Sequence, residues 1–162
     1  MLIRNPFIWL RRFRHRCGYG IHSPFAFSLV TQVLYCPGRY YADDRLYPLK
    51  DRMLHPRLTA VRRLMFRLAN HWQPTVISAP AEFHPYLHEG CRKAQLQVCQ
   101  GPMLTFEGNR GNMVVLLDLQ HNHETWQKLK NEPQTTVTFD LYDLGLAIFN
   151  PKLQRQHYII NW

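Results

Sequence analysis

The chain has 162 residues, of which 46% are hydrophobic and 19% are charged. This length fits one compact domain and excludes two large ones, and the apolar content excludes a disordered or collagen-like chain. The formal net charge of +9 is concentrated in residues 1–67, where 13 Lys and Arg stand against 3 Asp and Glu.

The first predicted element is a short basic amphipathic helix within residues 1–16. Its apolar residues Ile3, Phe7 and Leu10 recur at helical spacing. Two interpretations stay open: a helix that packs on the domain with its arginines in water, and a surface that contacts nucleic acid or an anionic membrane. The arginines predicted to contact a polyanion, in this helix and in a later one, are Arg11, Arg12, Arg14, Arg16, Arg62, Arg63 and Arg67.

The sequence predicts neither export nor a metal site. No apolar run reaches the roughly 18 residues of a transmembrane helix, and no small-residue cleavage site follows the N-terminal apolar run. The four cysteines form no C-x-x-C pair, and the nine histidines show no zinc-site spacing. We therefore expect reduced thiols, no bound metal and a cytoplasmic protein.

Two further helices are expected in the first half of the chain. Ser23 and Pro24 supply an N-cap and a proline at the first helical position, and the apolar stripe after them ends before residues 36–38. Residues 39–54 are typical of a loop or short helix. Residues 56–72 place apolar side chains at i, i+3, i+4 and i+7, with arginines on the other face, which we expect to be solvated.

The second half of the chain alternates predicted strands and helices. Strands are expected at residues 75–77, 95–98, 103–106, 113–119, 135–141, 144–149 and 157–161, and helices at 85–94 and 123–131. The continuous apolar run within 113–119 is typical of a strand buried on both faces of a mostly parallel sheet. Three successive strands at the end predict an antiparallel C-terminal edge. The expected organisation is a basic N-terminal helical segment, residues 1–54, and an α/β part, residues 55–162, in one compact unit.

Several stretches resemble one known family. Residues 20–27, GIHSPFAF, resemble the opening segment of a group of bacterial class I S-adenosylmethionine-dependent methyltransferases. Residues 64–74 are similar to the helix that leads into that family's first strand, and residues 114–160 to its closing strands. The resemblance implies a Rossmann-like sheet that ends in a reversed strand. Fewer than 40 residues separate the strand at Val76 from that at Val114, room for about one β-α-β unit, so the chain resembles an abridged member.

The departures from the family fall on its chemistry. The family's first strand leads into a glycine-rich turn, but here residues 76–83 read VISAPAEF, with no glycine and with Pro80 in the turn. The resemblance implies Ser78, Ala79 and Glu107 as the cofactor contacts. For Glu107, an exposed turn position is the alternative.

The catalytic candidates follow the buried strand of residues 113–119. They are Asp118, His121 and His123, because open α/β sheets bind ligands at the carboxyl ends of their strands. The alternative is that Asp118 or Asn122 caps the next helix.

The resulting prediction is a methyltransferase-like protein with a degenerate S-adenosylmethionine site, no bound cofactor and a binding or scaffold role. One alternative is an active S-adenosylmethionine-dependent methyltransferase of unknown substrate. The other is a basic adaptor for nucleic acid or an anionic membrane. Because an abridged sheet leaves a strand edge to protect, we also expect a homodimer or a protein partner.

Overall fold

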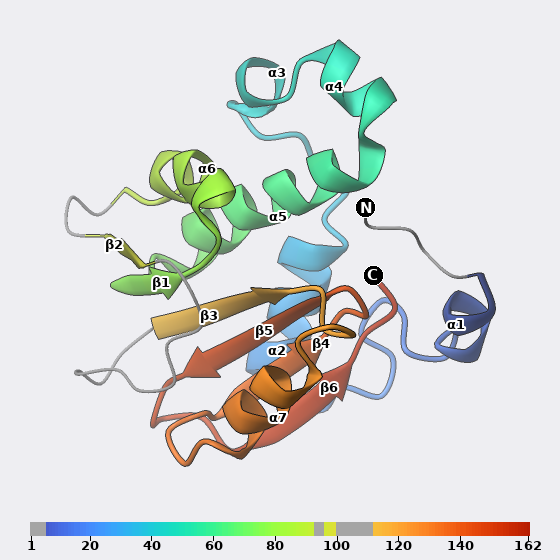
Figure 1. Ribbon diagram of the computed structural model, residues 1–162, viewed down its shortest axis with the longest axis vertical. Coiled ribbons are helices and arrows are strands. Elements are labelled where there is room, and N and C mark those ends of the chain that lie inside the picture. The colour runs from blue at the N-terminus through green and yellow to red at the C-terminus, as the bar shows by residue number, and fades with distance from the viewer. Residues whose placement is uncertain (1–5, 93–95, 100–111) are drawn as a thin grey trace.

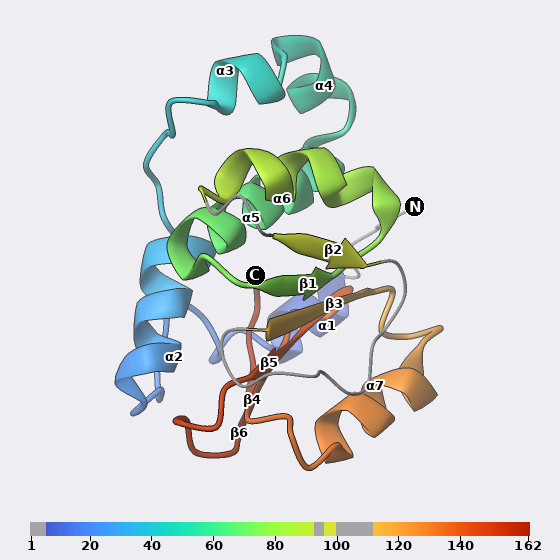
Figure 2. The same ribbon diagram turned by 90° about the vertical axis from the view of Figure 1, so that its left-hand side faces the viewer.

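The computed structural model describes residues 6–92, 96–99 and 112–162 as an α/β fold around a six-stranded mixed sheet (Figures 1 and 2). The sheet order is β2-β1-β3-β5-β4-β6. The strands are β1 (Val76–Ser78), β2 (Gln97–Cys99), β3 (Asn112–Leu117), β4 (Val137–Asp140), β5 (Leu144–Phe149) and β6 (Gln156–Ile159). The predicted strand at residues 103–106 lies outside the described residues.

One strand, β5, runs against the other five. It pairs antiparallel with β3 and β4, whereas β1 is parallel to β2 and β3, and β4 is parallel to β6. The mostly parallel sheet is therefore confirmed, but the predicted antiparallel C-terminal edge is wrong. The reversed strand lies inside the sheet: the short turn at 141–143 makes β5 antiparallel to β4, and the other side of β5 pairs with β3. The edge is β6, which joins the free side of β4.

The helices follow the predicted pattern closely. They are α1 (Pro6–Arg11), α2 (Pro24–Leu29), the π-helix η1 (Val30–Leu34), α3 (Asp43–Leu46), α4 (Leu49–Leu54), α5 (Pro56–Trp72), the 3-10 helix η2 (Ala81–Phe83), α6 (His84–Gly90) and α7 (His123–Asn131). Ser23 caps α2 as predicted, since its side chain accepts a hydrogen bond from the Ala26 N–H at 3.4 Å. Among the described residues, no helix is long and apolar enough to span a bilayer.

The core lies on both faces of the sheet. On one face, α2, η1, α5 and α6 pack against alternate residues of β3 such as Met113 and Val115. On the other face, Trp126 and Leu129 of α7 cover Val114 and its neighbours. Strand β3 is thus buried on both sides, as its unbroken apolar run predicted. Because α2 and η1 belong to the main cluster, the N-terminal helical segment shares its core with the sheet.

Candidate functional site

The candidate site lies where the parallel strands β1 and β3 end. A cavity of about 490 Å³ opens there. Its walls are residues 54–58 at the α4–α5 junction, Glu82 and Phe83 after β1, and Leu117 and Asp118 after β3. This is the edge at which open α/β sheets bind their ligands, so the position of the cavity agrees with the predicted edge.

The backbone groups of Ala79, in the turn after β1, are bonded to other segments of the chain. The Ala79 N–H donates to the Cys99 carbonyl at 3.0 Å, and the Ala79 carbonyl lies 3.0 Å from Nε2 of His84, which donates to it in the Nε2–H tautomer. Pro80, with φ −57° and ψ 143°, directs the chain into η2, where the Phe83 N–H bonds to the Pro80 carbonyl. The Phe83 side chain is fully buried.

Two predicted cofactor contacts lie at this turn. Ser78 is fully buried and Ala79 nearly so, and neither lines the cavity. Their contact with a cofactor stays a prediction, and both backbone groups of Ala79 are already bonded within the chain. Glu82, which the sequence did not single out, lines the cavity instead. Glu107 lies outside the described residues.

Asp118 and His121 form a hydrogen-bonded pair just after the C-terminal end of β3. Nδ1 of His121 lies 2.8 Å from each carboxylate oxygen of Asp118, and Asp118 itself has a left-handed φ of 52°. The His121 hydrogen bond holds the pKa of Asp118 below its ordinary value. The capping alternative is wrong, because neither Asp118 nor Asn122 caps α7 through its side chain. Asn122 occupies the cap position, but its amide donates to the Leu117 carbonyl instead.

His123 is not part of this pair. It lines a different cavity, of about 530 Å³, together with Arg11, His15 and Lys130. The three predicted catalytic residues are thus divided between two places: only Asp118 lines the sheet-edge cavity, and His121 reaches it through Asp118.

Replacement of His121 by alanine should raise the pKa of Asp118 toward its ordinary value, because the hydrogen bond that favours the carboxylate is lost. Since the pKa of Asp118 in the folded protein is depressed, the pairing stabilises the fold above the ordinary pKa and is lost as the pH falls through the folded value. An NMR titration of the Asp118 carboxyl carbon measures the shift. His123→Ala is the matched control, and an unchanged Asp118 pKa in His121→Ala would contradict the pairing.

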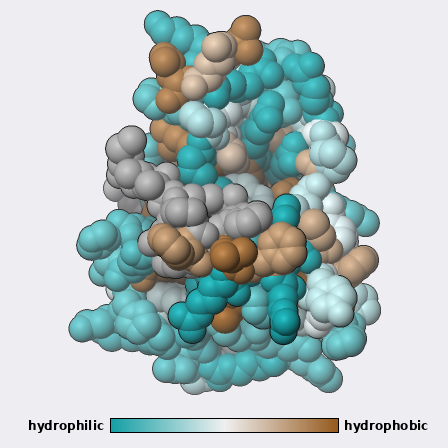
Figure 3. All heavy atoms as spheres, turned by 90° about the vertical axis from the view of Figure 1, so that its right-hand side faces the viewer, coloured by the Kyte–Doolittle hydropathy of each residue, from teal (hydrophilic) through white to brown (hydrophobic). Residues whose placement is uncertain are grey.

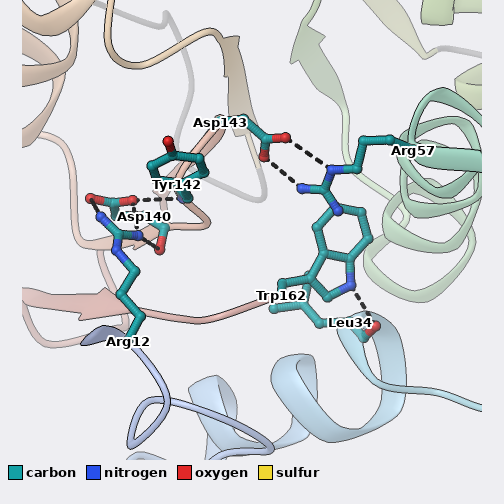
Figure 4. Close-up of polar contacts among 7 residues, drawn as sticks. All are labelled: Arg12, Leu34, Arg57, Asp140, Tyr142, Asp143 and Trp162. Atoms are coloured by element: carbon teal, nitrogen blue, oxygen red, sulfur yellow. Dashed lines mark hydrogen bonds and ion pairs between the residues drawn. The ribbon is translucent and has the colours of Figure 1, made fainter. Parts of the chain in front are cut away.

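Arg57 joins the cavity wall to the rest of the fold (Figure 4). Its guanidinium donates two hydrogen bonds to the Asp143 carboxylate, at 2.9 and 2.6 Å, and lies 4.3 Å from the centre of the Trp162 ring. The Trp162 indole N–H in turn donates to the Leu34 carbonyl at 2.8 Å. The helical spacing of residues 56–72 places Arg57 on the polar face but does not reveal this role, because its partners lie far along the chain.

Four of the seven arginines predicted to contact a polyanion are engaged within the fold. Arg12 donates two hydrogen bonds to Asp140, at 2.7 and 3.2 Å. Arg62 pairs with Asp51 and Arg63 with Asp43, each at 3.5 Å, and Arg67 donates to two carbonyls of the loop before α3, at 2.8 Å each. Arg67 is only 9% exposed, so the prediction of a fully solvated arginine face on α5 is wrong.

Helix α1 and the residues that follow it expose three apolar side chains. Phe7, Leu10 and Phe13 are 81%, 66% and 51% exposed, so the interpretation in which this face packs on the domain is wrong. Two contacts just after α1 fix its orientation. Arg12 donates a hydrogen bond to the Asp140 carboxylate, and the His15 carbonyl accepts one from the Asn161 N–H at 2.8 Å. Figure 3 shows hydrophobic residues among hydrophilic ones on this side of the molecule.

The remaining candidates are the cysteines and the possible metal ligands. All four cysteines are free thiols. Within residues 6–92, 96–99 and 112–162, no three His, Cys, Asp or Glu side chains are placed to hold a metal ion together.

Comparisons with protein-family models, with curated proteins and with solved structures found no match. The methyltransferase resemblance therefore rests on the sequence stretches quoted above.

Proposed function

We propose that the chain is an abridged methyltransferase-like domain that acts as a binding or scaffold protein and does not transfer a methyl group. The observation that carries the proposal is the closed turn after β1, in which the Ala79 N–H and carbonyl are both bonded within the chain. The quoted family stretches and the cavity at the ligand edge support the methyltransferase-like part of the proposal.

The residues at this edge do not fit S-adenosylmethionine in the way the family resemblance implies. That way needs a turn whose backbone can approach the methionine part of the cofactor, and glycine allows the approach because it has no Cβ. Here the turn carries Ala79 and Pro80, the Ala79 N–H donates to the Cys99 carbonyl, and the Phe83 side chain is fully buried.

Isothermal calorimetry with S-adenosylmethionine and S-adenosylhomocysteine tests the proposal. The expected result is no saturable heat up to millimolar ligand. A micromolar affinity, together with methyl transfer that Asp118→Ala abolishes, would instead establish the active methyltransferase. Asn131→Ala, a surface change at the end of α7, is the matched control for Asp118→Ala.

The exposed face of α1 favours a second function, contact with an anionic membrane. Phe7, Leu10 and Phe13 offer apolar insertion, and Arg11 and Arg14 have no ion pair with another described residue. Basic residues beside exposed apolar ones are typical of surfaces that bind anionic lipid.

Vesicle flotation checks this second function. We expect binding to phosphatidylcholine vesicles only when they contain phosphatidylserine, with a loss of about tenfold or more in the Phe7→Ser/Leu10→Ser/Phe13→Ser variant. Leu49→Ser/Met53→Ser removes exposed apolar residues of α4 and is the matched control. Equal binding by the α1 variant, or binding only to nucleic acid, would contradict membrane contact.

A further inference from the structure

A second cavity, of about 550 Å³, lies between η1, the loop that follows it, α4 and α5. Its lining holds a single carboxylate, that of Asp43, against five arginines: Arg39, Arg52, Arg57, Arg63 and Arg67. Aliphatic residues of η1 and α5 and the ring of Trp162 complete the wall. Guanidinium groups are rarely gathered around one space unless acceptors balance them.

The carboxylates in contact with these arginines do not balance them. Arg39 and Arg52 share Asp44, Arg57 binds Asp143, and Arg63 lies 3.5 Å from Asp43. Arg67 has no carboxylate and donates only to the Cys36 and Gly38 carbonyls. Five guanidinium groups thus face three carboxylates, which leaves two positive charges unmatched.

Donors in the same cluster lack acceptors. The Nε atoms of Arg52, Arg63 and Arg67 are buried and have no hydrogen-bond partner among the described residues. The one carboxylate of the lining also keeps an unpaired oxygen, since Oδ2 of Asp43 is buried without a hydrogen bond, 3.5 Å from a guanidinium nitrogen of Arg63. A buried donor without an acceptor destabilises a fold, and more so when it carries charge. Arg67 is more than nine-tenths buried, and its carbonyl contacts and the Tyr40 ring, 5.4 Å away, fix its guanidinium in place.

We propose that this cavity, which we call the arginine cavity, binds the dianion of a small phosphate monoester. The planar, forked N–H donors of an Arg guanidinium match the geometry of phosphate oxygens. A phosphate monoester carries about −1.5 to −2 charge at neutral pH, which matches the two unmatched positive charges of the cavity. The volume lies in the range of small-molecule sites, and Trp162 with its aliphatic neighbours provides a wall for the organic group. The proposal is independent of the proposed function, because it uses neither the turn after β1 nor Asp118.

Calorimetric titration with inorganic phosphate and with phenyl phosphate, at constant ionic strength, tests the proposal. We expect saturable binding of both, tighter for phenyl phosphate, and about tenfold or greater weakening in Arg63→Gln. The matched control is Arg62→Gln. Arg62 is the next residue of α5, but it pairs with Asp51 and does not line the cavity, so its replacement should leave the affinity unchanged.

If Arg63→Gln lowers the unfolding midpoint, the phosphate affinity of Arg52→Gln is measured in its place, because Arg52 lines the same cavity from α4. Absence of saturable phosphate binding by the unaltered protein would overturn the proposal. So would equal weakening by Arg62→Gln and Arg63→Gln, since that result would mean general attraction to a basic surface. The cofactor titration has no bearing on either outcome, so the two proposals fail separately.

Discussion

Replacement of Gly90 by alanine is expected to lower the free energy of unfolding by about 3 kcal/mol, at the upper end of overpacking effects. Gly90 ends α6 where this helix crosses α5. A Cβ at this position would lie 2.3 Å from the Phe66 carbonyl oxygen and 3.0 Å from the Ala69 Cβ. The obstacle is backbone of a buried helix, so relief requires the two helices to move apart.

Urea denaturation measures the loss, and Gly38→Ala is the matched control. A Cβ on Gly38 would meet only the Cys36 sulfur at 3.5 Å, an ordinary contact. We expect this control to change the free energy of unfolding by less than about 0.5 kcal/mol. Equal and small losses in the two variants would contradict the close crossing of α5 and α6.

Replacement of Arg57 by alanine should destabilise the fold by about 2–3 kcal/mol, somewhat less than for a fully buried pair. The Arg57 and Asp143 side chains are 20% and 12% exposed, so removal of the guanidinium leaves a largely buried carboxylate without its partner. The variant also removes the cation beneath Trp162. The second substitution Asp143→Asn should restore part of the loss, because it removes the unpaired charge.

Chemical denaturation of Arg57→Ala, the double variant and Arg39→Ala distinguishes this ion pair from a surface one. Arg39 and Asp44 are 64% and 73% exposed, so Arg39→Ala should cost less than about 0.5 kcal/mol. If Arg57→Ala costs no more than Arg39→Ala, the contact between α5, the β4–β5 turn and the C-terminus does not stabilise the fold.

Periodicity predicted the elements whose burial is one-sided or complete. The residues of each element are sufficient to predict the apolar stripe of α5, the buried strand β3 and the limits of α7. They are not sufficient to predict the place of β5, because a short turn predicts an antiparallel pair but does not say on which side the next strand joins. The sequence leaves the orientation of α1 open for a similar reason, because it depends on Asp140, which lies 128 positions away from Arg12.

The candidate site was predicted at the level of the sheet edge. Asp118 followed from its position after a buried strand, and it does line the cavity there. Ser78 and Ala79 follow only from their place at the end of the first strand, and the sequence does not reveal that Cys99 and His84, in other segments, bond to the backbone of Ala79. The arginines of α5 show the same limit, since helical spacing separates one face from another but does not reveal which charges the fold will bury.

The Ala79 amide tests the central claim, the closed turn after β1, most directly. Its hydrogen exchange and chemical shift are measured by NMR, with and without millimolar S-adenosylmethionine. Because the Ala79 N–H is bonded to the Cys99 carbonyl at 3.0 Å next to a buried core, we predict slow exchange and no change of shift with the ligand. Rapid exchange of this amide, or a saturable shift on addition of S-adenosylmethionine, would contradict a turn closed to the cofactor.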